Sequence, residues 1–312
     1  MALYTDLNRE QFEEILSSYD IGSLWNFRHL HGGVANSVYY FTTLGGEFIL
    51  TICNHKSPRD VRLRTVLLDN LFRAGLYVPE LIATKERKPF VYFNDQPIIV
   101  KRFIEGYPGT DAGEKILFDL GRKLAQIHTT TLSFELPYRM PYDSKQFLSV
   151  RRNNEYFGRW IIDKTRYLDE HIPKDAPIGL IHGDLFPDNF LVYDDEVIAI
   201  IDFEESCQFF YAFDIANALI GNCFEDKTFN KDKTKAFIDG YQSVRKLTPA
   251  EVNNFNFFIS YAACSLAYWR FKQFNVNHPD QDRKDSYKEM MEIADFYETA
   301  FTNSFFESFF KG

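Results

Sequence analysis

Residues 181–204 read IHGDLFPDNFLVYDDEVIAIIDFE, and this stretch decides the interpretation of the fold. Two apolar runs flank the polar triplet 194–196, a pattern typical of two strands joined by a tight hairpin turn. With the hairpin centred between residues 195 and 196, Asn189 lies opposite Asp202, and such cross-strand partners are ~5 Å apart at their Cβ atoms. The pattern therefore predicts that Asn189 and Asp202 each offer one oxygen to a shared cation.

The loop before this hairpin carries Asp184, five residues ahead of Asn189. A carboxylate in this position can accept a proton from an attacking hydroxyl. Mg²⁺ prefers oxygen ligands and usually keeps only one or two protein groups, and phosphoryl transfer needs positioning and neutralisation of the phosphate charge. Asp184 as the catalytic base, with Asn189 and Asp202 as the two metal ligands, meets these needs. His182 is expected to shape the loop rather than to react.

The spacing of these residues has the layout of the catalytic and metal-binding loops of protein kinases: Asp184-x4-Asn189, a strand pair, and then Asp202-Phe203. Gly183 stands where protein kinases have Arg, and Glu204 stands where they have Gly. These two differences favour the branch that contains aminoglycoside and choline kinases. A chance arrangement of acidic residues on a hairpin is the weaker interpretation, because every residue would have to fall at the matching place.

The chain before residue 104 predicts a small lobe that is rich in β-structure. An amphipathic helix is expected at 6–18, and a second helix at 59–74. Gly45-Gly46 and Asn94-Asp95 are typical of two-residue hairpin turns between antiparallel strands. The strands are expected at residues 25–30, 37–43, 47–53, 90–93 and 98–103.

The chain after residue 110 predicts a larger and mainly helical lobe, with the strand pair at 190–202 as its only interruption. Asp111-x-x-Glu114 has the pattern of a capping box, and Thr248 is expected to cap a second long helix that begins with Pro. The expected long helices lie at residues 111–130, 248–275 and 283–309.

Together these patterns predict an α+β chain with a two-lobed, protein-kinase-like fold. Residues 1–103 are expected to form a small antiparallel N-lobe that covers the nucleotide. Residues 104–110 contain Gly and Pro and are expected to form a hinge. Residues 111–312 are expected to form the larger helical C-lobe, with the catalytic loop and the acceptor site.

The contacts with the nucleotide are less defined in the sequence. The loop 32–37 links the first two strands, and the backbone N–H groups of such a Gly-rich loop can cover phosphates. Gly-Gly between strands is more often only a turn, and Gly33, Asn36 and Ser37 are the residues that we single out there. Protein kinases carry a Lys on the third strand, where this sequence has Thr51. The alternative cations nearby are His55, Lys56 and Lys101.

Two further residues each allow two interpretations. Asp214 opens an apolar helix, where it is either a carboxylate of the first helical turn or an anchor that accepts hydrogen bonds from the backbone of the catalytic loop. His128 ends the helix predicted at 111–130. For His128 a packed, hydrogen-bonded histidine is favoured over a ligand.

Composition and charge restrict the classes of partner. The chain has 312 residues and a net charge of −9, without a run of Lys or Arg, which argues against nucleic acid and anionic membranes as partners. No signal segment or long apolar stretch is present, so a cytoplasmic protein is expected. The four cysteines lack the spacing of a metal site and are expected to be buried thiols. The sequence does not indicate the oligomeric state.

Three segments of this chain resemble the homoserine kinases that share the aminoglycoside-phosphotransferase fold. They read IHGDLFPDN, IIDFEESC and YAFDIANALIGNCFE. Nearer the N-terminus, the segments 34–37 and 46–51 are similar to the V-E-N-S and G-x-F-I-L-T motifs of that family, which itself has Thr in place of the expected Lys. The sequence departs from the family at four places, namely Gly183, Glu204-Glu205, Asn222 and Ser265.

The resemblance implies transfer of the ATP γ-phosphate to the hydroxyl of L-homoserine, a step of threonine biosynthesis, with Mg²⁺ held by Asn189 and Asp202. It places the adenine against the connector near Phe103. An amino-acid acceptor needs a partner for its carboxylate, for which Arg270 is the candidate, and a partner for its amine, for which Glu204 is one candidate. The alternatives are an aminoglycoside- or choline-type kinase of the same fold, and a non-catalytic nucleotide-binding relative.

Overall fold

The computed structural model describes all residues except 1–4, 31–35, 55, 133–135, 138–142 and 311–312. The chain divides into two compact units. One consists of Met1–Gly106 with Ala199–Ile201, and the other of Tyr107–Ile198 with Asp202–Gly312. A β-rich first unit and a helical second unit confirm the predicted α+β, protein-kinase-like fold class.

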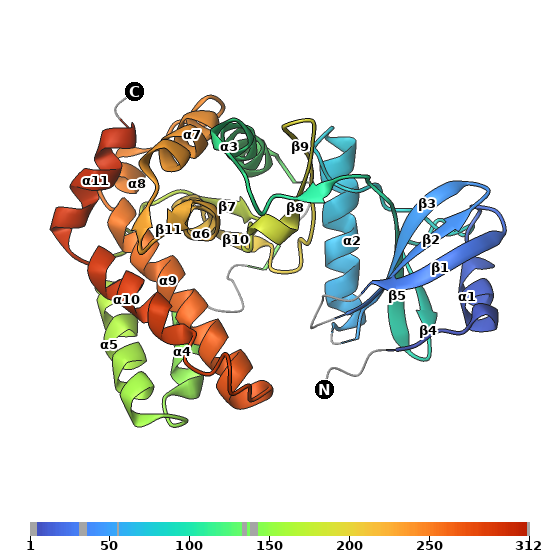
Figure 1. The fold of residues 1–312 in the computed structure, drawn as a ribbon, viewed down its shortest axis with the longest axis horizontal. Helices are drawn as coiled ribbons and strands as arrows, with labels where there is room; N and C mark the ends of the chain where they lie inside the picture. The colour runs from blue at the N-terminus through green and yellow to red at the C-terminus, as the bar shows by residue number, and fades with distance from the viewer. Residues whose placement is uncertain (1–4, 31–35, 55, 133–135, 138–142, 311–312) are drawn as a thin grey trace. The chain divides into compact units, whose positions relative to one another are not determined.

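The first unit is built on a five-stranded antiparallel sheet with the strand order β1-β2-β3-β5-β4. Helix α1 covers one face and helix α2 lies on the other (Figure 1). The α1 face is the larger core, because alternate residues of the central strands, such as Phe41, Phe48 and Leu50, are fully buried against Phe12. The elements are α1 (Arg9–Leu16), β1 (Leu24–Leu30), β2 (Ser37–Thr43), β3 (Gly46–Ile52), α2 (Pro58–Arg73), β4 (Val91–Phe93) and β5 (Gln96–Arg102).

Of the two hairpin turns predicted here, one is confirmed and one is shifted. Asn94 and Asp95 both have positive φ, 48° and 62°, as expected for the turn between β4 and β5. Thr43 pairs with Gly46, so the turn between β2 and β3 is made by residues 44 and 45 rather than by Gly45-Gly46. Gly46 is the first residue of β3.

The second unit contains nine helices within its described residues, together with short strand pairs. Helices α6 and α9 are buried on almost every side, which agrees with their nearly continuous apolar sequences. The helices are α3 (Glu114–Thr129), α4 (Ser144–Phe147), α5 (Glu155–His171), α6 (Tyr211–Cys223), α7 (Lys231–Gln242), α8 (Pro249–Val252), α9 (Phe255–Phe271), α10 (Tyr287–Tyr297) and α11 (Ala300–Phe310). The strands are β6 (Tyr107–Pro108), β7 (Ile178–Ile181), β8 (Phe190–Tyr193), β9 (Glu196–Ile200), β10 (Cys207–Phe210), β11 (Phe224–Glu225) and β12 (Thr228–Phe229).

Several predictions for this unit are wrong in detail. Helix α3 begins at Glu114 with Gly113 at its N-cap, so Asp111 forms no capping box. The capping box of Thr248 is present, but the helix that it starts ends after one turn and α9 begins separately. The last predicted helix is divided into α10 and α11. The hairpin at 190–202 is not the only β-structure, because β7 pairs with β10 and β11 pairs with β12.

Helices α3 and α7 approach each other closely because glycines face the neighbouring backbone. A Cβ atom on Gly121 would lie 2.1 Å from the carbonyl oxygen of Phe237, and one on Gly240 would lie 1.9 Å from that of Phe118. Neither glycine can be replaced without separating the helices. Their approach brings the C-terminal turns of α3 and α7 together, where His128 meets Tyr241.

Candidate active site

The catalytic loop predicted from the sequence follows β7 in the second unit. Gly183 has φ of +86°, and a Cβ atom there would lie 2.8 Å from the carbonyl oxygen of Glu205. Position 183 therefore requires glycine for two reasons: the backbone is left-handed there, and the backbone of Glu205 lies too close for a side chain. Asp184 follows directly and is half-buried. The loop is thus a tight turn that presents one carboxylate.

Asn189 is bound to Asp184. Its amide nitrogen Nδ2 donates to the backbone carbonyl oxygen of Asp184 at 2.7 Å and to the carboxylate oxygen Oδ2 at 3.0 Å. Because both interactions use the nitrogen, the amide oxygen Oδ1 points away from Asp184 and can accept a further ligand. Within the described residues, Oδ1 of the Asp184 carboxylate forms no hydrogen bond. Each residue therefore keeps one oxygen for another partner.

Asp202 follows β9 and is exposed. Its φ of +60° is unusual for a residue other than glycine, and such strained conformations concentrate at functional sites. The predicted centre of the hairpin is wrong by one residue, because the turn is made by Asp194 and Asp195, both with positive φ, and the cross-strand partners are therefore shifted by two residues. A continued ladder would therefore not place Asp202 opposite Asn189.

The electrostatic environment of Asp184 shows that the acidic residues converge. Burial raises the pKa of Asp184 to about 7, with further contributions from the negative charges of Asp202 and Glu205 and, to a smaller extent, of Asp188. The hydrogen bond from Asn189 opposes this effect. A carboxyl group with a pKa near neutrality can exchange a proton under physiological conditions, as a general base requires.

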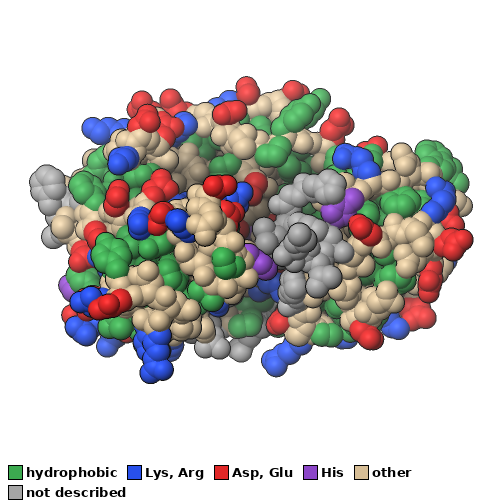
Figure 2. Space-filling view, turned by 60° about the horizontal axis from the view of Figure 1, so that its bottom comes forward, with side chains coloured by type: hydrophobic (Ala, Val, Ile, Leu, Met, Phe, Trp, Pro, Cys, Tyr) green, Lys and Arg blue, Asp and Glu red, His purple; other side chains and the backbone are tan. Residues whose placement is uncertain are grey.

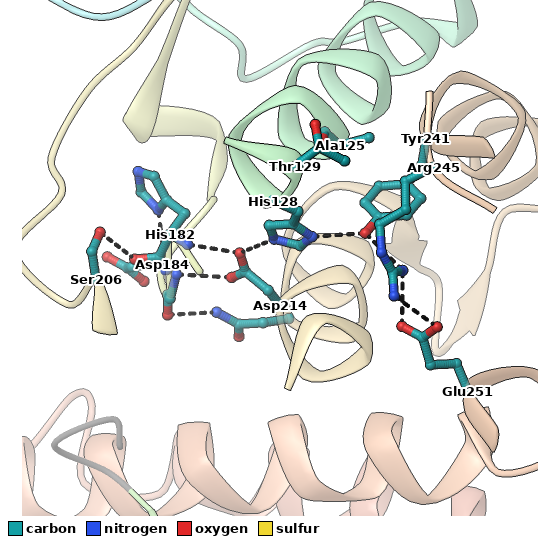
Figure 3. A network of polar contacts seen from close by, with 12 residues as sticks. Ala125, His128, Thr129, His182, Asp184, Ser206, Asp214, Tyr241, Arg245 and Glu251 are labelled. Carbon is teal, nitrogen blue, oxygen red and sulfur yellow. Dashed lines mark hydrogen bonds and ion pairs between the residues drawn. The ribbon is translucent and has the colours of Figure 1, made fainter. Parts of the chain in front are cut away.

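Asp214 on α6 holds the catalytic loop from behind (Figure 3). Its two carboxylate oxygens accept hydrogen bonds from the backbone N–H groups of His182 at 2.7 Å and of Gly183 at 2.8 Å. These hydrogen bonds favour the anchor interpretation over that of a first-turn carboxylate. Burial alone would raise its pKa, but the hydrogen bonds from His128 and from the loop lower the pKa of Asp214 below its usual value. Asp214 is therefore ionised.

Two residues that support the loop were not predicted. The side-chain amide of Asn217 donates to the carbonyl oxygen of Gly183 at 2.9 Å, and the Ser206 hydroxyl donates to that of His182 at 3.1 Å. Asn217 lies three residues after Asp214 on α6 and so faces the same side of the helix, a spacing that could have indicated it. Ser206 has no comparable signal in the sequence.

The nucleotide residues predicted in the first unit fall on two faces of its sheet. Thr51 and Lys101 lie on the face opposite the main core, because they pair with Ile99 and Ile49 on that face. Phe103 lies on the same side, with its ring 5.0 Å from that of Tyr40.

The other predicted nucleotide residues differ from this group. Ser37 pairs with Ile52 on the core face, and its hydroxyl accepts hydrogen bonds from Thr5 and Asn54. The structure therefore does not bring Ser37 together with Thr51 and Lys101. Asn36 is half-buried before β2, and Gly33 lies outside the described residues.

The two predicted acceptor contacts have different surroundings. The backbone N–H of Glu204 donates to the Asp202 carboxylate at 3.3 Å, which places Glu204 beside the candidate metal ligand. Arg270, at the end of α9, donates to the Glu289 carboxylate at 2.8 Å and to the backbone carbonyl oxygen of Ser286. Arg270 therefore connects α9 to α10, and a substrate carboxylate would compete with Glu289 for it.

The donor set suits magnesium. Asn189 Oδ1 and the exposed Asp202 carboxylate are hard oxygen donors, and a Mg²⁺ ion commonly takes one or two such groups and completes its shell with phosphate and water. The described residues contain no group of three or more His, Cys, Asp or Glu that could hold a metal ion, as a dedicated all-protein cage would require.

Charged side chains of both signs lie on the surface of the described residues. On the face shown in Figure 2, acidic and basic side chains are interspersed among the residues drawn in colour. Within the described chain, none of the helices combines the length and the apolar character that crossing a bilayer requires.

Comparison with known proteins gives consistent matches. A family model described as "Phosphotransferase enzyme family" matches residues 26–247. A homoserine kinase of Methylobacterium nodulans is 33% identical over 268 residues, covering 81% of this chain and 82% of the relative. Homoserine kinases of Rhizobium meliloti and Agrobacterium fabrum match at 31% and 32% identity.

Solved structures show the same fold. An amicoumacin kinase in complex with AMP-PNP and Ca²⁺ superimposes with a TM-score of 0.75 at 16% identity, covering 93% of this chain and 94% of that one. A microcompartment-associated aminopropanol kinase superimposes with a TM-score of 0.70 at 18% identity, covering 96% and 99%. At these identities, the likeness establishes the fold.

Proposed function

The chain belongs to the phosphotransferase enzyme family, and from this premise we propose that it transfers the γ-phosphoryl group of ATP to the side-chain hydroxyl of L-homoserine. Membership of this family, with homoserine kinases as relatives, makes the chain an ATP-dependent small-molecule kinase. The observation that carries the mechanism is the half-buried Asp184, bonded to Asn189 and influenced by the charge of Asp202. L-Homoserine is the acceptor on which the named relatives act.

In the proposed reaction, Asp184 accepts the proton of the acceptor hydroxyl through Oδ1. A bond forms between the hydroxyl oxygen and the γ-phosphorus, the bond from this phosphorus to the β–γ bridging oxygen breaks, and ADP leaves. Oδ2 stays bound to Asn189, which holds the carboxylate plane while the proton moves. Asp214 keeps the loop in place through the backbone of His182 and Gly183.

Asn189 Oδ1 and Asp202 are the residues that would hold Mg²⁺, which supplies charge neutralisation on the phosphate oxygens when bound. In the first unit, the face with Thr51, Lys101 and Phe103 is the part that we expect to contact the nucleotide. Lys101 provides the positive charge there.

One observation favours a second candidate, an amino alcohol that has no carboxylate. The cation predicted to bind the substrate carboxylate, Arg270, is already paired with Glu289. Carboxylates near Asp184, by contrast, suit an acceptor that carries an amine. A kinase for a small amino alcohol would need only the second interaction.

Three acceptors that differ by one group each test the proposal: L-homoserine, 3-aminopropan-1-ol, which lacks the carboxylate, and 4-hydroxybutanoate, which lacks the amine. ADP release is measured for each with saturating ATP and Mg²⁺. We expect kcat/KM to be highest for L-homoserine. A higher value for 3-aminopropan-1-ol would support the second candidate, and turnover confined to other alcohols, such as choline or aminoglycosides, would refute both.

A further inference from the structure

A continuous chain of polar contacts leads from the back of the catalytic loop, past the C-terminal turn of α7, to α8 (Figure 3). His128 Nε2 lies 3.0 Å from Asp214 Oδ2, and His128 Nδ1 lies 2.7 Å from the Tyr241 hydroxyl. Arg245 then donates to the same hydroxyl at 3.2 Å, and its guanidinium makes two parallel hydrogen bonds of 3.0 Å with the Glu251 carboxylate. The chain thus joins four helices through side chains alone.

Burial makes these contacts obligatory. His128 and Tyr241 are buried, and Glu251, which forms an ion pair with Arg245, has no exposed surface. A buried carboxylate is tolerated when it is paired and hydrogen-bonded, and Glu251 also accepts hydrogen bonds from the backbone and the hydroxyl of Thr248. The Arg245 guanidinium additionally stacks over the Tyr211 ring at 4.5 Å. The position of Arg245 is therefore determined on several sides.

The direction of every proton in this chain follows from its two ends. The Asp214 carboxylate favours a donor at His128 Nε2, and the Tyr241 hydroxyl, whose oxygen is occupied by Arg245, favours an acceptor at His128 Nδ1, so both ends act on the same tautomer. A neutral imidazole with that proton has an acceptor at Nδ1, so the Tyr241 hydroxyl must donate to it. The Tyr241 oxygen in turn accepts from Arg245, which can only donate.

The charges around His128 support a neutral ring. Burial lowers the pKa of His128 below its usual value, and Arg245 lowers it as well, whereas Asp214 raises it. Glu251 also raises it, by charge alone. The Tyr211 ring of α6 stacks on the imidazole of His128, with 4.6 Å between the ring centroids. On α7, burial raises the pKa of Tyr241, so its hydroxyl keeps its proton.

We propose that Arg245 and Glu251 position the catalytic loop from a distance, by fixing the proton of Tyr241 and thereby the tautomer of His128. With the proton on Nε2, His128 donates to Asp214 and holds its carboxylate in the plane that receives the backbone N–H groups of the loop. With the proton on Nδ1, a lone pair would face the carboxylate, and the anchor would be repelled. Tyr241, Arg245 and Glu251 are positioning residues in this scheme, since they contact neither substrate nor the reacting atoms.

The inference rests on the proposed role of the loop that carries Asp184, but its first test needs no turnover. The ¹⁵N chemical shifts of the histidine side chains report which ring nitrogen carries the proton. In the wild-type protein we expect the proton of His128 on Nε2. In Tyr241→Phe, which removes only the hydroxyl, we expect a mixture of tautomers or a protonated ring. A wild-type His128 with its proton on Nδ1 would overturn the proposal.

The second test is kinetic. Outer-shell hydrogen-bonding partners commonly contribute ~10–100-fold to activity, and for Tyr241→Phe we expect kcat to fall ~10-fold with an unchanged KM for ATP. Tyr268→Phe is the matched control, because Tyr268 is also fully buried and its hydroxyl bonds to Ser149. The control should lose a similar hydrogen bond and keep kcat. Equal kcat in wild type and Tyr241→Phe would overturn the proposal.

A double variant covers the case in which Tyr241→Phe folds poorly. Arg245→Met with Glu251→Met removes both charges and leaves no unpaired ion, and the Tyr241 hydroxyl becomes free to turn away from His128. We expect the same mixture of tautomers and the same loss of kcat. The two possible failures can be told apart. If the proposed function is wrong, the wild-type protein turns over no alcohol. If only the positioning role is wrong, the wild type is active and the variants keep its kcat.

Discussion

Replacement of Asp184 by Asn should remove activity and, in the absence of metal, make the protein more stable at neutral pH. The ionised carboxylate is unfavourable where it stands, because burial and the charges of Asp202, Glu205 and Asp188 raise its pKa from 3.8 to about 7. At about 1.36 kcal/mol for each pKa unit, this difference corresponds to ~4 kcal/mol. Asp184 is only half-buried, so we expect solvent screening to leave about half of this, ~2 kcal/mol.

The raised pKa of Asp184 also determines how the stability gain of Asp184→Asn should vary with pH. The folded pKa of Asp184 lies above the unfolded one, so the stability contributed by this group is complete below pH 4 and is lost as the pH rises through about 7. The amide of the variant does not titrate. The gain in the free energy of unfolding for Asp184→Asn should therefore be small near pH 4, increase up to pH 7 and stay constant above it.

The assay is thermal unfolding in EDTA between pH 4 and 8.5, paired with turnover in Mg²⁺. For a domain of about 200 residues, ~2 kcal/mol corresponds to a rise in Tm of about 4–8 °C. Turnover should fall by at least ~10³-fold, since the base is lost. Asp188→Asn is the matched control: Asp188 is exposed and contributes less to the pKa of Asp184, so this variant should change Tm little. A variant Tm that is lower than wild type at pH 8, or a gain that does not grow with pH, would refute the reasoning.

Three further outcomes are expected. Asp202→Asn removes one proposed Mg²⁺ ligand, so the Mg²⁺ concentration for half-maximal turnover should rise at least ~10-fold; an unchanged titration would exclude Asp202 as a ligand. Lys101→Met should raise the KM for ATP ~10-fold, while Lys88→Met, an exposed lysine of the same unit, should leave it unchanged. Arg245→Ala leaves Glu251 buried and unpaired and should cost about 3–5 kcal/mol in urea unfolding, most of which the Arg245→Met/Glu251→Met variant should recover.

The parts of the site that local sequence determines were predictable. Strand and turn patterns depend on neighbouring residues, and the strands of the first unit were found to within a few residues. The loop–hairpin spacing singled out Asp184, Asn189 and Asp202 as candidates from one continuous stretch, and the structure joins Asp184 to Asn189 by a hydrogen bond. Local patterns failed where tertiary contacts decide where an element begins. The helix predicted from residue 111 begins only at Glu114, because the preceding segment forms β6 and a turn.

The support of the loop could not be predicted, because its members lie far apart in the sequence. His128 and Tyr241 are separated by 113 residues and meet only because glycines let α3 and α7 approach. No pattern within one helix indicates which residue of another helix will face it. Asp214 allowed two interpretations for the same reason, since its partners are on a loop that begins 32 residues earlier.

The candidate metal ligands Asn189 and Asp202 were derived from a wrong register, yet both act on Asp184, and the reason lies in the backbone. Regular pairing ends before Asp202, since β9 ends at Ile200, and Asp202 itself takes the left-handed conformation. Its carboxylate is therefore directed by a turn. The hairpin centre is displaced by one residue, so cross-strand partners change by two residues and each side chain stays on its predicted face of the ribbon. Asp184 then acts as the common neighbour, since it is bonded to Asn189 and its pKa responds to Asp202. The spacing of the motif thus predicts the chemistry because it specifies where the strands stop, and the strained residues at those ends give the site its geometry.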